Sequence, residues 1–83
     1  MFINVKKLNS KAKLPERATA TSAGADLCAC IDDDVVLMPG DRKLIPTGLA
    51  IAVPTGYGGF VFARSGLSSK FGVSLANCVG VID

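Results

Sequence analysis

The amino-acid sequence predicts a small all-β protein made of many short strands. Apolar residues make up 49% of the 83 residues, and nine glycines and four prolines interrupt them at short intervals. No segment keeps a helical spacing of apolar residues over three turns, and short apolar runs between turn residues are typical of all-β folds. A chain of this length forms one domain at most, with about 60–65% of its unfolded surface buried, so partner subunits are expected.

The expected strands are apolar runs bounded by turn-forming residues: 2–6, 26–31, 35–38, 43–45, 49–53, 60–63, 73–75 and 78–82. The run Asp32-Asp33-Asp34 turns the chain after the second of them, and Pro39-Gly40-Asp41 after the third. Pro46-Thr47-Gly48 and Pro54-Thr55-Gly56 bound the strand between them. Residues 68–72 fit either one helical turn or a loop.

The charge pattern argues against nucleic-acid binding and against a preformed metal cluster. The net charge is +2, with basic residues crowded into the first part of the chain. No aromatic residues are interleaved with them, so an exposed basic edge strand is favoured over a nucleic-acid arm. The carboxylates of 32–34 are adjacent and point in different directions, which favours a solvated turn over a metal site.

The cysteines indicate a reducing setting. Cys28, Cys30 and Cys78 form an odd set without a Cys-x-x-Cys pair, and the chain has no histidine, so a structural zinc site of about four ligands is excluded. Small buried apolar residues are the default interpretation of these cysteines. The apolar start Met1-Phe2-Ile3 is too short for a signal peptide, and no run approaches a membrane span. We therefore expect a cytoplasmic protein with no membrane partner.

Three glycine-containing segments concentrate the residues suited to phosphate chemistry. They are 23–27 around Asp26, 64–67 beginning Arg64-Ser65-Gly66, and 80–83 ending in Asp83. Arginine offers a permanent forked charge, serine a rotatable hydroxyl, and glycine lets backbone N–H groups approach an anion. One such segment alone is equally consistent with a turn and a surface charge; three in this order favour a phosphate site.

Their order and surroundings resemble the trimeric dUTPase family, which splits dUTP into dUMP and pyrophosphate. Residues 22–27 resemble its first motif, 64–70 its second, and Asn77 with 80–83 the start of its third. The resemblance covers almost the whole chain and implies one domain over 1–83, a distorted jelly-roll-like β-barrel that is here incomplete, and a homotrimer with active sites shared between subunits. The chain stops inside the third motif, so we expect the N-terminal part of a family protomer.

The resemblance also assigns roles to particular residues. Arg64, Ser65 and Gly66 would grip the triphosphate, and Asp26 would hold Mg²⁺ through water. Asp83 would be the catalytic general base that activates the attacking water. The uracil pocket would be formed by Asn77, Gly80, Val81 and Ile82.

Two alternatives remain beside Mg²⁺-dependent dUTP hydrolysis. One is a catalytically silent fragment that binds nucleotide or a partner protein, and the other is a relative similar to dCTP deaminases. Asp83 is the last residue, and a frayed terminus with a second carboxylate is a poor place for a general base. The tyrosine beyond the third motif, the fourth motif and the C-terminal arm of the family are not in this sequence. Activity of the 83 residues alone is therefore expected to be low.

Overall fold

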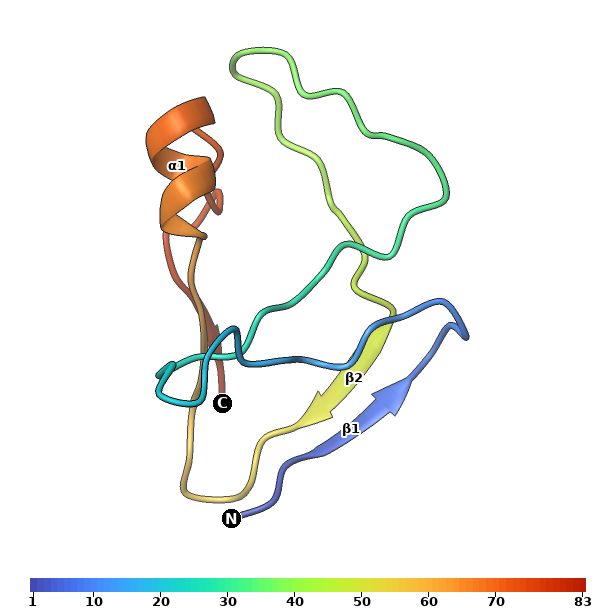
Figure 1. The fold of residues 1–83 in the computed structure, drawn as a ribbon, viewed down its shortest axis with the longest axis vertical. Helices are drawn as coiled ribbons and strands as arrows, with labels where there is room; N and C mark the ends of the chain where they lie inside the picture. The colour runs from blue at the N-terminus through green and yellow to red at the C-terminus, as the bar shows by residue number, and fades with distance from the viewer. The chain divides into compact units, whose positions relative to one another are not determined.

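Two short antiparallel sheets and one helix make up the regular structure of the chain. The computed structural model describes residues 1–83 (Figure 1), with the elements β1 (Asn4–Lys7), β2 (Leu49–Ala52), β3 (Gly59–Val61), α1 (Ser65–Phe71) and β4 (Gly80–Ile82). These elements belong to two units, Met1–Ala52 and Val53–Asp83. None of the chain's helices has the length and apolar character needed to cross a membrane.

In the first unit, β1 and β2 form an antiparallel pair (Figure 1). Val5 lies opposite Ile51 and is the half-buried residue of β1. In β2, Leu49 and Ile51 are half-buried while the two alanines are exposed. This alternation is expected for strands that place successive side chains on opposite faces, so Val5, Leu49 and Ile51 share one face of the pair with Lys7.

The tightest packing of the first unit surrounds Gly48. Its φ is +69°, and a Cβ added there would lie 2.9 Å from the Cβ of Ala12 and 3.1 Å from the Sγ of Cys30. Ala12 is the one buried apolar residue of the chain, 3% exposed. Backbone hydrogen bonds hold the same place, from Leu8 N–H to the Gly48 carbonyl and from Cys30 N–H to the Pro46 carbonyl, both 2.7 Å. Both the backbone conformation and the space available at position 48 require glycine.

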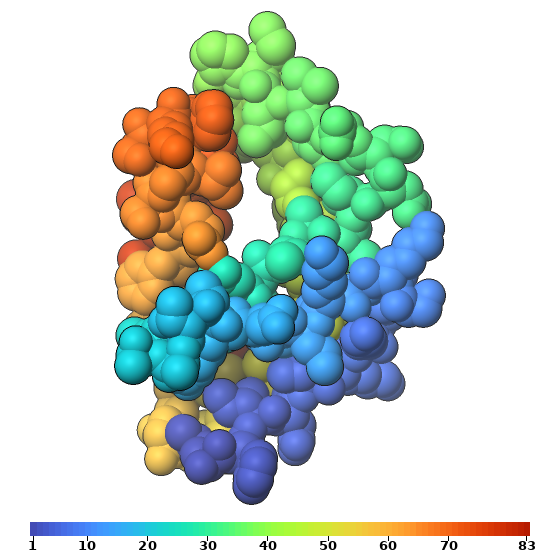
Figure 2. Space-filling model, in the orientation of Figure 1, coloured from blue at the N-terminus to red at the C-terminus, as the bar shows by residue number.

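Residues 31–46 form an extended arm of the first unit, green in Figures 1 and 2. Its turn is closed by Asp41, whose N–H donates to the Met38 carbonyl at 2.9 Å and whose carboxylate accepts the Met38 N–H at 3.0 Å. The Lys43 ammonium donates to the Val36 carbonyl at 2.7 Å. The apolar side chains of the arm are exposed, up to 101% for Leu44. The arm is therefore held by hydrogen bonds around its turn and has no core of its own.

In the second unit, β3 and β4 pair in antiparallel fashion, with Phe60 opposite Val81. Glycines lie at both ends of this short ladder: a Cβ on Gly59 would lie 3.3 Å from the Cβ of Ile82, and one on Gly80 would lie 3.2 Å from the Cβ of Val61. Small residues at these positions allow the strands to approach each other with bulky residues on the partner strand. The ladder joins the segments that precede α1 and follow it.

The all-β expectation is confirmed only in part. Strands form within or overlapping the expected runs 2–6, 49–53, 60–63 and 78–82, and residues 68–72 prove to include the end of a helix. The other expected runs, 26–31, 35–38, 43–45 and 73–75, form no strand. A strand exists only through hydrogen bonds to a neighbouring strand, and the chain provides no continuous partner for these four runs.

The expected jelly-roll-like barrel is not confirmed. The chain contains two separate two-stranded sheets and no closed barrel. A barrel closes when every edge is paired, whereas each sheet here consists of two strands only. What the structure has in common with the expected fold is a β-rich chain with short antiparallel strand pairs.

Candidate functional site

The Arg64-Ser65-Gly66 segment lies where a strand gives way to a helix. Arg64 is the N-cap residue of α1, with an extended backbone of φ −74° and ψ 129°, and its carbonyl accepts the Ser68 N–H at 3.0 Å. Ser65 and Gly66 are the first two residues of the helix. All three are exposed, so their polar groups are accessible from solvent.

Gly66 and Gly24 are glycines that the fold itself does not require. Neither has a positive φ, and a Cβ added at either position would meet no atom within 4 Å. A glycine in a helix costs about 0.5–1 kcal/mol relative to alanine, so Gly66 weakens α1 without a gain in packing. Since neither backbone conformation nor packing requires glycine here, the remaining reason for glycine at both positions is that it lets a ligand approach the backbone closely.

Residues of the expected uracil pocket lie in and beside β4. Gly80, Val81 and Ile82 are the strand itself, and β3 is its only neighbour in the sheet, so one edge of β4 is unpaired. Asn77 belongs to the turn before it, in which the Cys78 N–H donates to the Leu75 carbonyl at 3.1 Å and Cys78 has φ +64°. An unpaired strand edge presents alternating donors and acceptors, which is the chemistry needed to recognise a base edge.

Arg64 and Asn77 leave the β3–β4 ladder at the same end, because the terminal pair there is Val61 with Gly80. Asp83 lies beyond the other end, after the pair of Gly59 with Ile82. Figure 1 shows this C-terminus at the end of the ladder away from α1. Because Ile82 pairs with Gly59, Asp83 lies across from position 58, six residues before Arg64. At about 3.3 Å per residue of extended backbone, six residues correspond to about 20 Å. Within one chain, Asp83 and Arg64 therefore lie at opposite ends of this ladder.

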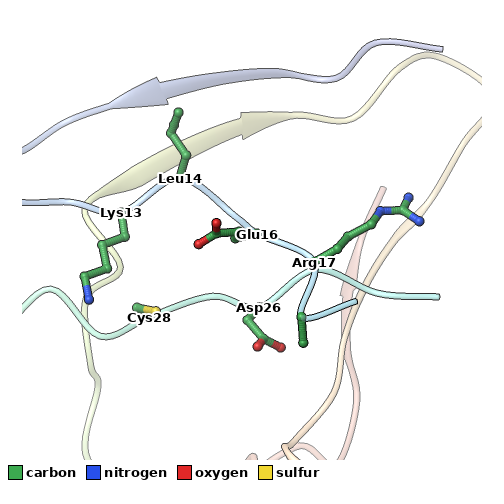
Figure 3. Close-up of a pocket in the computed structure, with 7 residues that line it drawn as sticks. Lys13, Leu14, Glu16, Arg17, Asp26 and Cys28 are labelled. Atoms are coloured by element: carbon green, nitrogen blue, oxygen red, sulfur yellow. The ribbon is translucent and has the colours of Figure 1, made fainter. Parts of the chain in front are cut away.

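Asp26 lies in the first unit and is fixed by its backbone. Its N–H donates to the Glu16 carbonyl at 2.8 Å, and the Glu16 N–H donates back at 3.4 Å. The Asp26 side chain is half-buried and lines a cavity of about 310 Å³ together with Lys13, Leu14, Glu16, Arg17, Ala18 and Cys28. Figure 3 shows the carboxylates of Asp26 and Glu16 pointing in different directions. The cavity thus combines two carboxylates with two cationic side chains.

The loop before Gly24 is closed by its own hydrogen bonds. The Arg17 guanidinium donates to the Ser22 carbonyl at 2.9 Å, which directs Arg17 away from Asp26 in Figure 3. The hydroxyls of Thr19 and Ser22 lie 2.7 Å apart, and the Thr19 N–H donates to the Ser22 hydroxyl at 3.0 Å. These contacts hold the approach to the first glycine-containing segment without a buried core.

The ligand chemistry around Asp26 fits a largely hydrated hard cation. No group of three or more His, Cys, Asp or Glu side chains gathers anywhere in the chain. Mg²⁺ keeps several waters and commonly takes one or two carboxylates together with phosphate oxygens. A cavity lined by the carboxylates of Asp26 and Glu16 is in keeping with that mode of binding.

Two residues that shape these segments are not among the expected site residues. Glu16 lies outside every expected strand, yet it provides the backbone partner of Asp26. Ser68 lies where one helical turn or a loop is expected, and its hydroxyl donates to the Val73 carbonyl at 2.8 Å. No local sequence signal indicates either contact.

The structure is that of a β-rich protein with a candidate nucleotide-binding surface. This surface combines the exposed Arg64-Ser65-Gly66 segment with the unpaired edge of β4. Comparison with known sequences gives this class its family. The family model described as dUTPase matches residues 10–83. The chain belongs to the dUTPase family.

Relatives support the same assignment. A deoxyuridine 5'-triphosphate nucleotidohydrolase of Syntrophotalea carbinolica is 52% identical over 81 residues, which is 98% of this chain and 55% of that protein. One of Desulfitobacterium hafniense is 58% identical over 72 residues, 86% of the chain and 48% of the relative. One of Burkholderia mallei is 48% identical over 86 aligned residues, 100% of the chain and 58% of the relative. The chain thus spans about half the length of the curated relatives it matches.

Proposed function

We propose that this chain provides part of a site that hydrolyses dUTP to dUMP and pyrophosphate. The observation that carries the proposal is the pair Gly24 and Gly66, which neither backbone conformation nor packing requires. Both flank charged residues of the family's motifs, Asp26 and Arg64. Close approach of a ligand to the backbone would explain glycine at each of these positions, and phosphate is the ligand that suits the backbone at Gly66.

The triphosphate would be held by Arg64, Ser65 and Gly66. The guanidinium of Arg64 can donate two parallel hydrogen bonds to phosphate oxygens, and the hydroxyl of Ser65 can rotate to donate a third. The exposed position of these residues leaves room for an anion. Binding would position the α-phosphorus for attack rather than supply covalent chemistry, as is usual in phosphoryl transfer.

The base would be recognised by Asn77 and the unpaired edge of β4. Backbone N–H and C=O groups of Gly80, Val81 and Ile82 can pair with the edge of uracil. A tight strand wall excludes the thymine methyl group by contact, and cytosine would leave a donor facing a donor. We therefore assign dUTP as the preferred nucleotide.

Asp83 would act as the general base. Its carboxylate would orient a water opposite the departing pyrophosphate and accept its proton, while the oxygen bonds to the α-phosphorus and the bond to the bridging oxygen breaks. In the structure Asp83 and Arg64 lie at opposite ends of the β3–β4 ladder. This separation supports a site completed by Asp83 of one subunit and Arg64 of another, in a homotrimer.

Exposed apolar side chains support assembly. Leu44 is 101% exposed, Phe2 96% and Phe71 73%, and Ala12 alone is buried. A stable protein covers such residues with other chain segments or subunits.

Asp26 would hold Mg²⁺ through water. When bound, the ion supplies charge that offsets the negative phosphate oxygens. The backbone at Asp26 is held by its pairing with Glu16. The three cysteines are free thiols, in keeping with the proposed reducing, cytoplasmic setting.

The test compares two proteins. One is the 83-residue chain, and the other, the extended protein, joins it to the part of the Syntrophotalea relative that follows the matched region. Pyrophosphate release from dUTP is followed with Mg²⁺, and the relative itself is the positive control. We expect turnover from the extended protein and at least about 10²-fold less from the 83 residues, because misplacing reacting groups by about 1 Å costs that much.

The outcomes separate the alternatives. An inactive extended protein beside an active relative would contradict a hydrolytic site and support the silent, nucleotide-binding alternative. Ammonia release from dCTP would indicate the deaminase-like alternative. Full turnover from the 83 residues alone would show that the site needs no further segment.

A further inference from the structure

The segment 64–73 is a closed unit that hydrogen bonds hold at both ends. At its start, the Ser68 N–H donates to the Arg64 carbonyl at 3.0 Å. At its end, Gly72 adopts a left-handed conformation with φ +68°, and its N–H donates to the Ser68 carbonyl at 3.0 Å. The Val73 N–H then donates to the Leu67 carbonyl at 3.3 Å. The helix is therefore tied to the residue that follows it.

Ser68 adds a second tie to the same residue. Its hydroxyl donates to the Val73 carbonyl at 2.8 Å. Both backbone polar groups of Val73 are thus held from α1, the N–H by Leu67 and the C=O by Ser68. Ser68 is half-buried, and every other residue of α1 is exposed.

These ties matter because α1 is largely exposed. The helix has seven residues and none of them is buried, with Leu67 48% and Phe71 73% exposed. It contacts neither β3 nor β4. An isolated helix of this length is unstable in water, so the position of α1 depends on its end contacts.

We propose that Ser68 is a positioning residue for the triphosphate grip of Arg64, Ser65 and Gly66. This inference rests on the proposed function. The hydroxyl fixes the last turn of α1 on Val73, while the first turn begins at the grip itself. Removing the hydroxyl leaves Val73 with one of its two hydrogen bonds to α1, so the short helix becomes more mobile. Because α1 begins at Arg64, this mobility displaces Arg64 from the position in which it binds phosphate.

The test uses three variants of the extended protein. Ser68→Ala removes the hydroxyl, and Ser68→Thr keeps it. Ser74→Ala is the matched control, because Ser74 is exposed, follows Val73 directly and lies outside both α1 and the grip. KM and kcat for dUTP are measured well below the unfolding temperature, together with hydrogen exchange of the Val73 amide.

We expect Ser68→Ala to raise KM on the order of 10-fold with kcat within about 3-fold, since sub-ångström misplacement costs less than the roughly 10²-fold of a 1 Å shift. Val73 exchange should accelerate, Ser68→Thr should restore both values, and Ser74→Ala should change neither. A purely structural role would lower the active fraction, and so apparent kcat, at unchanged KM. That pattern, or an unchanged KM in an active protein, would overturn the inference.

Failure of the proposed function can be told apart from failure of the positioning role. If the wild-type extended protein releases no pyrophosphate, the proposed function fails. Hydrogen exchange of the Val73 amide still tests whether the Ser68 hydroxyl holds Val73. Val73 exchange that Ser68→Ala leaves unchanged would overturn the positioning role, with or without activity.

Discussion

Replacing Gly66 with alanine should raise stability and lower activity at the same time. In the structure Gly66 is the second residue of α1, its φ is not positive, and an added Cβ meets no atom within 4 Å. The methyl group therefore fits without strain. Neither packing nor backbone conformation opposes the substitution.

The stability gain follows from backbone entropy. Glycine-to-alanine changes at compatible positions stabilise by about 0.4–1 kcal/mol, mainly by restricting the unfolded chain. For a protein of about 150–250 residues, the size class of the extended protein, 1 kcal/mol shifts Tm by about 2–4 °C. We therefore expect Tm to rise by about 1–4 °C.

The activity loss follows from the proposed close approach of phosphate. A methyl group at position 66 would hold the triphosphate about 1 Å from its productive place, which costs roughly 10²-fold in kcat/KM. Thermal unfolding and pyrophosphate release from dUTP, both on the extended protein, measure the two effects.

Gly72→Ala, at the C-cap of the same helix, is the matched control. Gly72 has φ +68°, and a left-handed conformation costs a non-glycine residue about 1–2 kcal/mol, so this variant should lose stability. Kinetics within twofold of wild type for Gly66→Ala, with the expected rise in Tm, would refute the assignment of Gly66 to the phosphate site. A fall in Tm would refute the description of its surroundings.

Further predictions concern charge, base, packing and specificity. Arg64→Ala in the extended protein should raise the KM for dUTP about 10–150-fold, since a charge-assisted contact contributes about 1.5–3 kcal/mol; an unchanged KM would place the triphosphate elsewhere. Asp83→Asn should lower kcat about 10²–10⁴-fold with little effect on KM, and wild-type turnover would remove its role as general base. Gly48→Ala should destabilise by about 1–3 kcal/mol in urea titration, because its Cβ would lie 2.9 Å from that of Ala12; an unchanged midpoint would contradict this packing. Competition assays should rank dUTP above dTTP and UTP, and equal affinity for dTTP would contradict the pocket assigned to 80–82.

Much of the candidate site could be predicted from sequence, because its chemistry is local. Arg64, Ser65 and Gly66 are consecutive, and their charge, hydroxyl and bare backbone indicate an anion site before any fold is known. The strands at β1 and β2 follow from apolar runs bounded by turns, and the structure confirms them. The roles of Asp26 and Asp83 stay predictions that the proposed experiments address.

Strand formation beyond these elements could not be predicted from pattern alone. Runs 35–38 and 43–45 have the composition of strands, but they lie on an extended arm with exposed side chains. Hydrogen bonding in a sheet depends on a neighbour that can be distant in sequence. Local pattern gives no information on whether that neighbour is present.

By itself, the sequence determined the family, the order of the motifs and the residue types available for phosphate, because these depend on side-chain chemistry and short spacing. Only the tertiary structure decided that Gly48 is required by packing whereas Gly66 is not. It also placed Asp83 and Arg64 at opposite ends of one ladder and tied Ser68 to Val73. These facts depend on strand register and on which atoms share a space, and register and packing arise from contacts between residues that are not neighbours in the chain.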